Sequence, residues 1–261
     1  MENKINTSLY KFEPLNGQRI SETLKWFPYD TKELFNENIK KYSDSIHLNN
    51  FLKNPIEYKL NNYGFRSDID YCVESNSVGN VFLGCSHTMG IGHHLDNIWS
   101  YKLSKKIGGD YYNISEPGAG IITQYRYLKY FSNKLKFKNV FHFLPDECWY
   151  RWEGFKNGEP IQLTPDEIQA NPNYSDFFFD IIQNDRQRLH YVFSYIDAIK
   201  AICYENNANY YIVTKSFYER KDGKDPYHIT KHPARDLEHY YIEEHDDIVE
   251  LFSNQYQNYL I

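Results

Sequence analysis

Apolar positions along the chain fall into two patterns from about residue 79 onward. Short apolar runs predict buried strands over 80–85, 110–115, 139–144 and 209–215. Apolar residues at helical spacing predict helices over 95–109, 121–135, 175–207 and 243–260. Strands that alternate with helices are typical of a mostly parallel sheet covered by helices on both faces. We therefore expect functional side chains at the carboxyl ends of the strands.

The first quarter of the chain is more polar and has few long apolar runs. Residues 30–42 predict a short amphipathic helix that begins at Asp30 or Thr31, because either side chain can cap a helix N-terminus. We interpret residues 1–75 as an extension packed on a main domain that covers 76–261.

One segment interrupts the alternation of strands and helices. Residues 153–174 are rich in Gly, Pro and Asn, which predicts a long insertion or loop. A loop of this length in a compact domain is often a lid or a binding element. A surface excursion without function explains the same composition equally well, so both interpretations stay open.

Composition excludes some classes of partner. The 261 residues carry a net charge of -6 with acidic and basic residues interspersed, which argues against a nucleic acid or an anionic membrane as the main partner. No stretch is apolar and long enough to cross a bilayer. The N-terminal residues hold no apolar core of a signal peptide, so we expect a cytoplasmic protein, with release by a route that needs no signal peptide, or packaging into a particle, left open.

The spacing of the four cysteines bears on metal binding and on disulfides. They stand at positions Cys72, Cys85, Cys148 and Cys203, and no two of them form a Cys-x-x-Cys pair. A zinc knuckle needs such pairs, and a disulfide framework needs a denser set. We therefore expect reduced thiols.

The sequence "VFLGCSHTMGIG" at 81–92 places small and polar residues directly after a predicted strand. A phosphate-binding loop needs Gly, four residues and then Gly-Lys-Ser/Thr, and no Lys is present here. The dinucleotide-binding pattern Gly-x-Gly-x-x-Gly is absent as well. A serine between a strand and a helix is an exposed nucleophile near backbone N–H groups, so we favour Ser86 in that role.

A serine nucleophile needs a base. Asp236 and His239 form an Asp-x-x-His pair just before the last predicted helix. At this spacing the carboxylate can hold the imidazole in one tautomer and leave its other nitrogen to accept a proton. The pattern is common by chance, and a second copy stands at Asp225 and His228.

The order of these segments resembles the SGNH hydrolases, the family of GDSL-like esterases and lipases. "FLGCSHTMG" is similar to the first family block, "NISEPGAG" to the second and "DLEHY" to the last, and "NNYGFRSD" is similar to a leader segment of some members. The resemblance covers the chain from about residue 60 onward. It implies that Ser86, Asp236 and His239 are catalytic, that the N–H groups of Ser86 and Gly118 bind the oxyanion, and that no cofactor or metal takes part.

Two departures from the family pattern affect the expected chemistry. Cys85 stands where the family usually has Asp, which also raises the alternative of a cysteine nucleophile. The third block normally supplies an Asn to the oxyanion, but Asp146 in "FLPDECWYRWE" occupies that place. A carboxylate cannot donate a hydrogen bond, and the loss of one donor costs about 3 kcal/mol of transition-state stabilisation. Either the two N–H groups suffice, or Arg151 replaces the donor, or the protein is slow or inactive.

Several side chains near these blocks are further candidates. Glu116 either binds substrate or caps the next helix, and Trp149 and Arg151, with Trp152, either contact a sugar or pack in the interior. The histidines of this region are candidate metal ligands, but no ligand spacing is present, so we favour polar residues that line the cleft: His87, His93, His94 and His142.

The sequence thus predicts an α/β protein, a three-layer α/β/α sandwich with a mostly parallel, flavodoxin-like sheet and an N-terminal extension. The expected function is hydrolysis of a small acyl ester through an acyl-enzyme, with an O-acetyl group on a carbohydrate as the substrate that the resemblance implies. Transfer of the acyl group to a sugar hydroxyl, or an inactive fold kept for binding or as a structural component, are the alternatives. The oligomeric state is left open.

Overall fold

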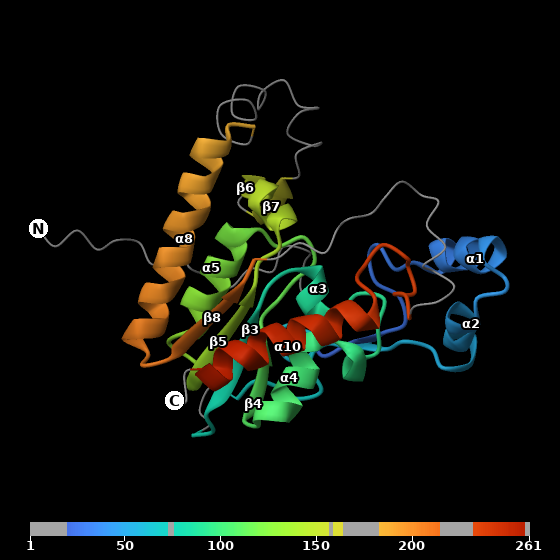
Figure 1. Cartoon of the computed structure of the whole chain (residues 1–261), viewed down its shortest axis with the longest axis horizontal. Coiled ribbons are helices and arrows are strands. Elements are labelled where there is room, and N and C mark those ends of the chain that lie inside the picture. The colour runs from blue at the N-terminus through green and yellow to red at the C-terminus, as the bar shows by residue number, and fades with distance from the viewer. Residues whose placement is uncertain (1–19, 73–75, 157–158, 164–182, 215–231, 259–261) are drawn as a thin grey trace, which may run out of the picture.

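The centre of the molecule is a four-stranded parallel sheet. The computed structural model describes residues 20–72, 76–156, 159–163, 183–214 and 232–258 (Figure 1). The strands lie in the order β4-β3-β5-β8, and each neighbouring pair is parallel: β4 (Asp110–Asn113), β3 (Gly79–Leu83), β5 (Phe137–Phe143) and β8 (Asn209–Val213). In chain order this is 2-1-3-4, the flavodoxin-like arrangement, so the predicted fold class is confirmed.

Apolar runs form these strands because helices cover both faces of the sheet. All five residues of β3 are buried, and six of the seven residues of β5 are buried. A strand with two covered faces has no position where a polar side chain can reach water, and its sequence therefore becomes a continuous apolar run. The four strands predicted from such runs are all present within a few residues.

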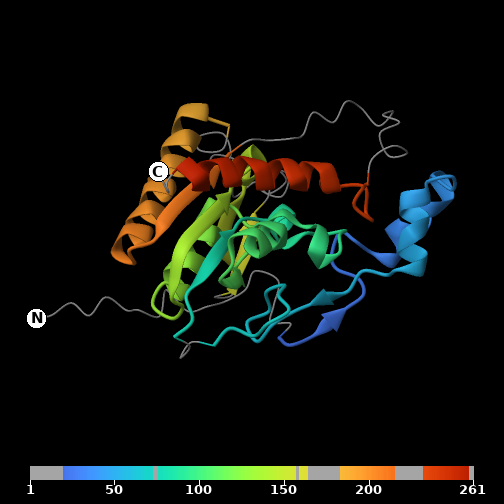
Figure 2. The same ribbon diagram turned by 60° about the horizontal axis from the view of Figure 1, so that its bottom comes forward.

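Two helices pack on each face of the sheet (Figures 1 and 2). On one face, α4 (Trp99–Ile107) and α10 (Ile242–Asn258) contribute a cluster of aromatic rings, in which Trp99 stacks on Phe252 with centroids 4.9 Å apart. On the other face, α5 (Ile121–Phe131) and α8 (Asp185–Glu205) contribute aliphatic side chains together with Tyr127 and Phe131 to a second apolar cluster. The sheet and these four helices form the three predicted layers.

The predicted helix over 95–109 is shorter than expected. Residues Leu95–Asn97 form a separate 3-10 turn, Ile98 is extended, and α4 begins only at Trp99. Ile98 leaves the helix because its buried side chain packs directly on Gly90, where an added Cβ would lie 1.9 Å from Ile98 Cγ2. The end of the helix at Gly108 agrees with the prediction.

The segment predicted as a long insertion or loop begins with a hairpin. Strands β6 (Trp152–Lys156) and β7 (Glu159–Leu163) pair antiparallel, with Pro160 opposite Phe155. The hairpin is an insertion outside the main sheet, and Pro160 is tolerated because in a two-stranded sheet its missing N–H disrupts no sheet interior. Residues 164–174 lie outside the described residues.

The N-terminal layer, residues 20–60, contains two helices and a short antiparallel strand pair. Helix α1 (Lys32–Lys41) starts as predicted, with Thr31 Oγ1 accepting a hydrogen bond from the N–H of Leu34. The sequence did not predict α2 (Ile46–Lys53) or the pair of β1 (Thr23–Leu24) with β2 (Tyr58–Lys59). The layer has its own apolar cluster, which Met89 and Ile91 of the main body enter. Figure 2 shows the layer beside the start of α10.

The length and hydropathy of the helices decide whether any of them could span a bilayer. Within the part of the chain that the structure describes, no helix is both long and apolar enough to span a membrane.

Two glycines with positive φ separate backbone strain from packing. Gly90 is left-handed, with φ of 78° and ψ of 51°, whereas Gly108 has φ of 72° and ψ of 179°, a region that is essentially open to glycine alone. A Cβ at Gly108 would meet no atom within 4 Å. We expect Gly108→Ala to lower the free energy of unfolding by about 2 kcal/mol, the cost of the backbone conformation alone. Gly90→Ala combines a left-handed backbone with the collision with Ile98 and should cost about 4 kcal/mol. Urea unfolding measures both, and a loss for Gly90→Ala no greater than that for Gly108→Ala would contradict the proposed packing.

Candidate functional site

The carboxyl ends of three strands meet at one edge of the sheet. The chain runs from β3 to β4 on one side and then crosses to β5 on the other side, so β3 marks the point where the strand order reverses. Ligands of open α/β sheets bind at such a point. The segments that follow these strands are α3 (Ser86–Met89), the loop 114–120, and η3 (Asp146–Tyr150).

Ser86 is the first residue of α3 and is 6% exposed. The chain turns tightly here, because Cys85 is extended and Gly90 ends the helix in the left-handed conformation. The N–H of Gly90 donates to the carbonyl of Ser86 at 2.8 Å. A glycine is required at position 84, since an added Cβ would lie 2.0 Å from Thr88 Oγ1. Local sequence therefore builds the turn that carries the serine.

Asp236 and His239 form the predicted pair. His239 Nδ1 lies 2.6 Å from Asp236 Oδ2, and Asp236 Oδ1 accepts the N–H groups of Glu238 and His239 at 3.0 and 3.2 Å. Asp236 is 1% exposed, and this burial raises its pKa, but the charge of His239 and these hydrogen bonds outweigh burial and lower the pKa overall. The ionised carboxylate fixes the proton on Nδ1, which leaves Nε2 as the basic nitrogen.

The turn with His239 packs against the segment that follows Ser86. The His239 ring lies 5.2 Å from the ring of His87, the residue that follows Ser86. The N–H of Arg235 donates to the carbonyl of Gly92 at 2.9 Å. Within the described residues, Ser86 and His239 make no direct hydrogen bond. In enzymes without bound substrate this contact is often long, so its absence leaves the pair a candidate.

Glycines shape the neighbouring loop. Gly118 has φ of 82°, and the chain then passes Gly120, where an added Cβ would lie 2.3 Å from the carbonyl oxygen of Arg151. The loop after β4 therefore lies directly against the segment after β5. Glu116 is buried and accepts a hydrogen bond from the Tyr127 hydroxyl. The N-cap residue of α5 is Gly120, which has no side chain to cap the helix.

The candidate residues that follow β5 differ in their exposure and in their contacts. Asp146 is exposed at the first position of η3, and Trp149 is half-buried against the apolar core. Trp152 packs edge-on against Tyr191 of α8 at 5.2 Å, so this ring is used in packing. Arg151 is half-buried, and its Nη1 lies 3.9 Å from Cys148 Sγ.

Of the four histidines expected to line the cleft, His87 is buried beside His239, and His93 and His142 lie in the interior with no exposed surface. His142 lies within β5 with no exposed surface, and it is bonded to Gln124 at 2.5 Å and to the Tyr210 hydroxyl at 2.7 Å. His93 is also fully buried and contacts the carbonyl of Tyr240. The expectation is wrong for these two residues, because packing of α5 and α10 covers them. Among the described residues, no three His, Cys, Asp or Glu side chains are grouped to hold a metal ion.

Sequence reasoning missed a buried thiol pair beside the serine. The interaction of Cys85 with the Cys148 thiol, together with nearby Arg151, lowers the pKa of Cys85 to about 6 against the opposing effect of burial. The same contact raises the pKa of Cys148 well above its usual range. The two cysteines stand 63 positions apart in the sequence, so no local pattern signals their contact.

Two surface cavities lined by described residues lie away from this edge of the sheet. One of about 440 Å³ is lined by β8 and the end of α10, including Tyr210 and Gln255. Another of about 420 Å³ is lined by residues 26–28 and 31–33 of the N-terminal layer. Neither is lined by Ser86 or His239, so the candidate site rests on side-chain geometry. The alternative pair, Asp225 and His228, lies outside the described residues.

Comparisons with known proteins assign no family or function to this site. No family model matches the chain, and neither the curated proteins nor the solved structures contain a significant match.

Buried neutral histidines make the fold sensitive to acid. Burial lowers the pKa of His93 to about 4 and that of His142 to about 3, whereas an unfolded histidine titrates near its usual value of 6.5. Above pH 6.5 neither state binds the proton. Below it only the unfolded chain does, so each residue should reduce the free energy of unfolding by up to about 1.4 kcal/mol per pH unit until the folded pKa is reached. Urea unfolding between pH 7 and 5 measures this slope. His142→Gln should lessen it, and a stability independent of pH would contradict the burial.

Proposed function

We propose that the protein is a serine esterase that cleaves a small acyl ester through an acyl-enzyme. The observation that carries this proposal is the buried Asp236 carboxylate 2.6 Å from His239 Nδ1, in a turn packed against the segment that follows the strand-end serine. A buried carboxylate that orients an imidazole beside a hydroxyl is the arrangement used for nucleophilic acyl transfer.

The chemistry assigns one role to each side chain. Ser86 Oγ attacks the acyl carbon while His239 Nε2 accepts the hydroxyl proton. The tetrahedral intermediate collapses, His239 gives the proton to the leaving alkoxide, and the acyl group stays on Ser86. Water then attacks the acyl-enzyme by the same steps and releases the acid. Asp236 holds the tautomer throughout and stabilises the imidazolium.

The oxyanion of the intermediate needs donors. The N–H groups of Ser86 and Gly118 are proposed for this role, and the positive φ of Gly118 fits a turn that exposes an N–H. Asp146 is exposed and, as a carboxylate, has no proton to donate. Arg151 lies against Gly120 and remains the candidate for the third donor.

The proposed substrate is a small acyl ester, such as an O-acetyl group on a carbohydrate, met in the cytoplasm. Acyl transfer to a sugar hydroxyl uses the same side chains, and adding a sugar acceptor to the assay separates the two reactions by their products. An inactive fold used for binding or as a structural component is the alternative from a different class. The mechanism proposed here uses no cofactor.

Hydrolysis of p-nitrophenyl acetate tests the proposal. We expect Ser86→Ala and His239→Gln each to lower kcat/KM by about 10³-fold, because the nucleophile and its base act as a unit. His228→Gln is the matched control, since it removes the histidine of the second Asp-x-x-His pair, and it should keep the activity. Equal rates for wild type and Ser86→Ala would end the esterase proposal, and a loss in His228→Gln alone would move the base to that residue.

Cys85 is a second candidate nucleophile, because its lowered pKa of about 6 favours a thiolate at neutral pH. Yet its side chain is only 1% exposed and faces Cys148 in the apolar core. We therefore expect Cys85→Ala to keep most of the activity that Ser86→Ala loses. The reverse pattern in the same assay would identify a cysteine hydrolase.

A further inference from the structure

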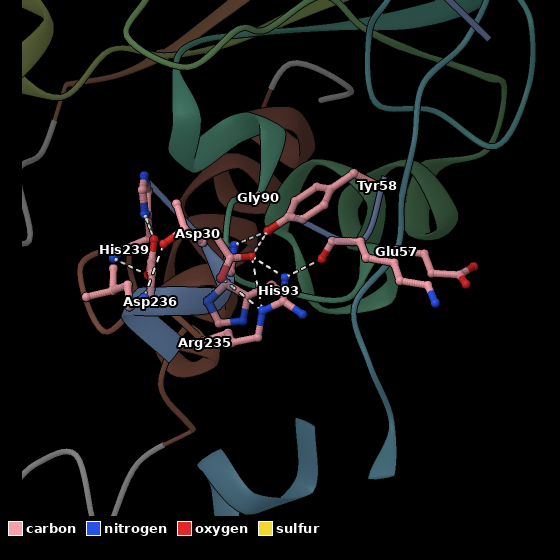
Figure 3. Close-up of polar contacts among 12 residues, drawn as sticks. Asp30, Glu57, Tyr58, Gly90, His93, Arg235, Asp236 and His239 are labelled. Carbon is pink, nitrogen blue, oxygen red and sulfur yellow. Dashed lines mark hydrogen bonds and ion pairs between the residues drawn. The ribbon is translucent and has the colours of Figure 1, made fainter. Parts of the chain in front are cut away.

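A buried ion pair joins the N-terminal layer to the residue before Asp236. Arg235 Nε lies 2.9 Å from Asp30 Oδ1, and Arg235 Nη2 lies 2.6 Å from Asp30 Oδ2 (Figure 3). Asp30 has no exposed surface and Arg235 is 1% exposed. The pair is bidentate, which fixes the direction as well as the position of the Arg235 side chain. Since Arg235 precedes Asp236 in the chain, the ion pair also fixes where the turn with His239 begins.

Other groups of the N-terminal layer hold the same turn. Arg235 Nη2 donates to the carbonyl of Lys25 at 2.7 Å, and the guanidinium lies 3.9 Å from the centre of the Trp26 ring. Asn38 of α1 donates its side-chain N–H to the carbonyl of Asp236 at 3.1 Å. The N-terminal layer therefore binds the backbone of Asp236, the proposed catalytic residue, directly.

The segment that follows Ser86 is also bound to Asp30, through Tyr58. The Tyr58 hydroxyl donates to Asp30 and accepts the N–H of Gly92 at 2.8 Å. Gly92 belongs to the segment that follows α3, and its carbonyl accepts the N–H of Arg235. Asp30 thus connects, through one residue on each side, the segment after Ser86 and the turn that carries His239.

A second arginine holds the end of α3. Arg66, which is 1% exposed, donates to the carbonyl of Gly90 and to that of His93, the latter at 2.6 Å. Its guanidinium also lies 4.5 Å from the centre of the Tyr58 ring. Two buried arginines therefore meet around Tyr58 and Asp30, one bound to the serine segment and one to the histidine turn.

The turn itself is held in an unfavourable conformation. Leu237, between Asp236 and His239, has φ of 61° and packs against the apolar cluster of the N-terminal layer. A branched side chain in the left-handed region persists only where its surroundings enforce it, and such strain gathers at functional sites.

Stability alone is a poor explanation for this ion pair. Burial raises the pKa of Asp30 even though Arg235 and Tyr58 favour the charged form, which shows that desolvation is heavy here. A buried ion pair is often no more stabilising than apolar side chains of the same volume, and fixing one geometry is its better-attested use.

We infer that Asp30 is a positioning residue for the proposed esterase: through Arg235 and Tyr58 it sets the Asp236–His239 pair against the serine segment, so that the N-terminal layer is part of the catalytic apparatus. This inference rests on the proposed function. It goes beyond it in assigning a role in the reaction to a layer that supplies no group to the reacting atoms.

Three variants of the full chain test the inference. Asp30→Asn removes the charge that holds Arg235, and Tyr58→Phe removes the bridge to Gly92 while keeping the ion pair. Leu48→Ala is the control, because Leu48 is fully buried in the same layer and its loss weakens packing without removing a polar contact. All three should lower the melting temperature.

The catalytic readout separates positioning from stability. We expect Asp30→Asn to lower kcat for p-nitrophenyl acetate by about 10²-fold with little change in KM, because a displacement of about 1 Å in the base is enough for such a loss. Tyr58→Phe should give a smaller loss in kcat. Leu48→Ala should keep the wild-type kcat at temperatures where it is folded.

A spectroscopic readout makes the test independent of activity. In wild type the Nδ1 proton of His239, bonded to Asp236, should give a proton resonance at low field in NMR, identified by its absence from His239→Gln. It should be lost in Asp30→Asn and kept in Leu48→Ala. An unchanged kcat and an unchanged resonance in folded Asp30→Asn would overturn the inference, and if that variant does not fold, the same outcome in Tyr58→Phe would overturn it. A wild type without esterase activity would contradict the proposed function, while the loss of the resonance would still show the positioning.

Discussion

The hydrogen bond between Asp236 and His239 is the interaction on which the candidate site depends. It selects one tautomer of the imidazole and gives the buried carboxylate a partner that offsets its desolvation. The bond can form only if the turn from Arg235 to His239 keeps its strained shape, and Asp30 and Asn38 hold that turn from outside the main sheet. The site is therefore a product of two parts of the chain about 200 residues apart, which is why the polar N-terminal layer matters for chemistry.

The sheet was predictable because its cause is local. Every strand covered on both faces leaves a short apolar run in the sequence, and four such runs gave four strands in the expected order. The differences arose at contacts that the propensity of a single segment does not show. Ile98 leaves the predicted helix to pack on Gly90, and the predicted insertion around Pro160 begins with a pair of strands.

The residues of the site fall into two groups in the same way: those that local sequence features indicate and those that only the folded chain brings together. The glycine before Cys85, the serine at the strand end and the Asp-x-x-His spacing are local features, and the sequence was enough to select these residues. The ion pair of Asp30 with Arg235, the contact of Cys85 with Cys148 and the burial of His142 join residues that are distant in sequence. A single sequence shows such residue types but not their partners, so it could suggest Asp30 only as a helix cap.

Covalent labelling with a fluorophosphonate tests the central claim most directly, because the reagent needs a serine that a neighbouring base has activated. The account predicts that mass spectrometry finds one phosphonate on the peptide with Ser86, and that His239→Gln abolishes the labelling. Labelling of a different serine, or labelling of Ser86 at the same rate without His239, would contradict the claim that these two side chains act together.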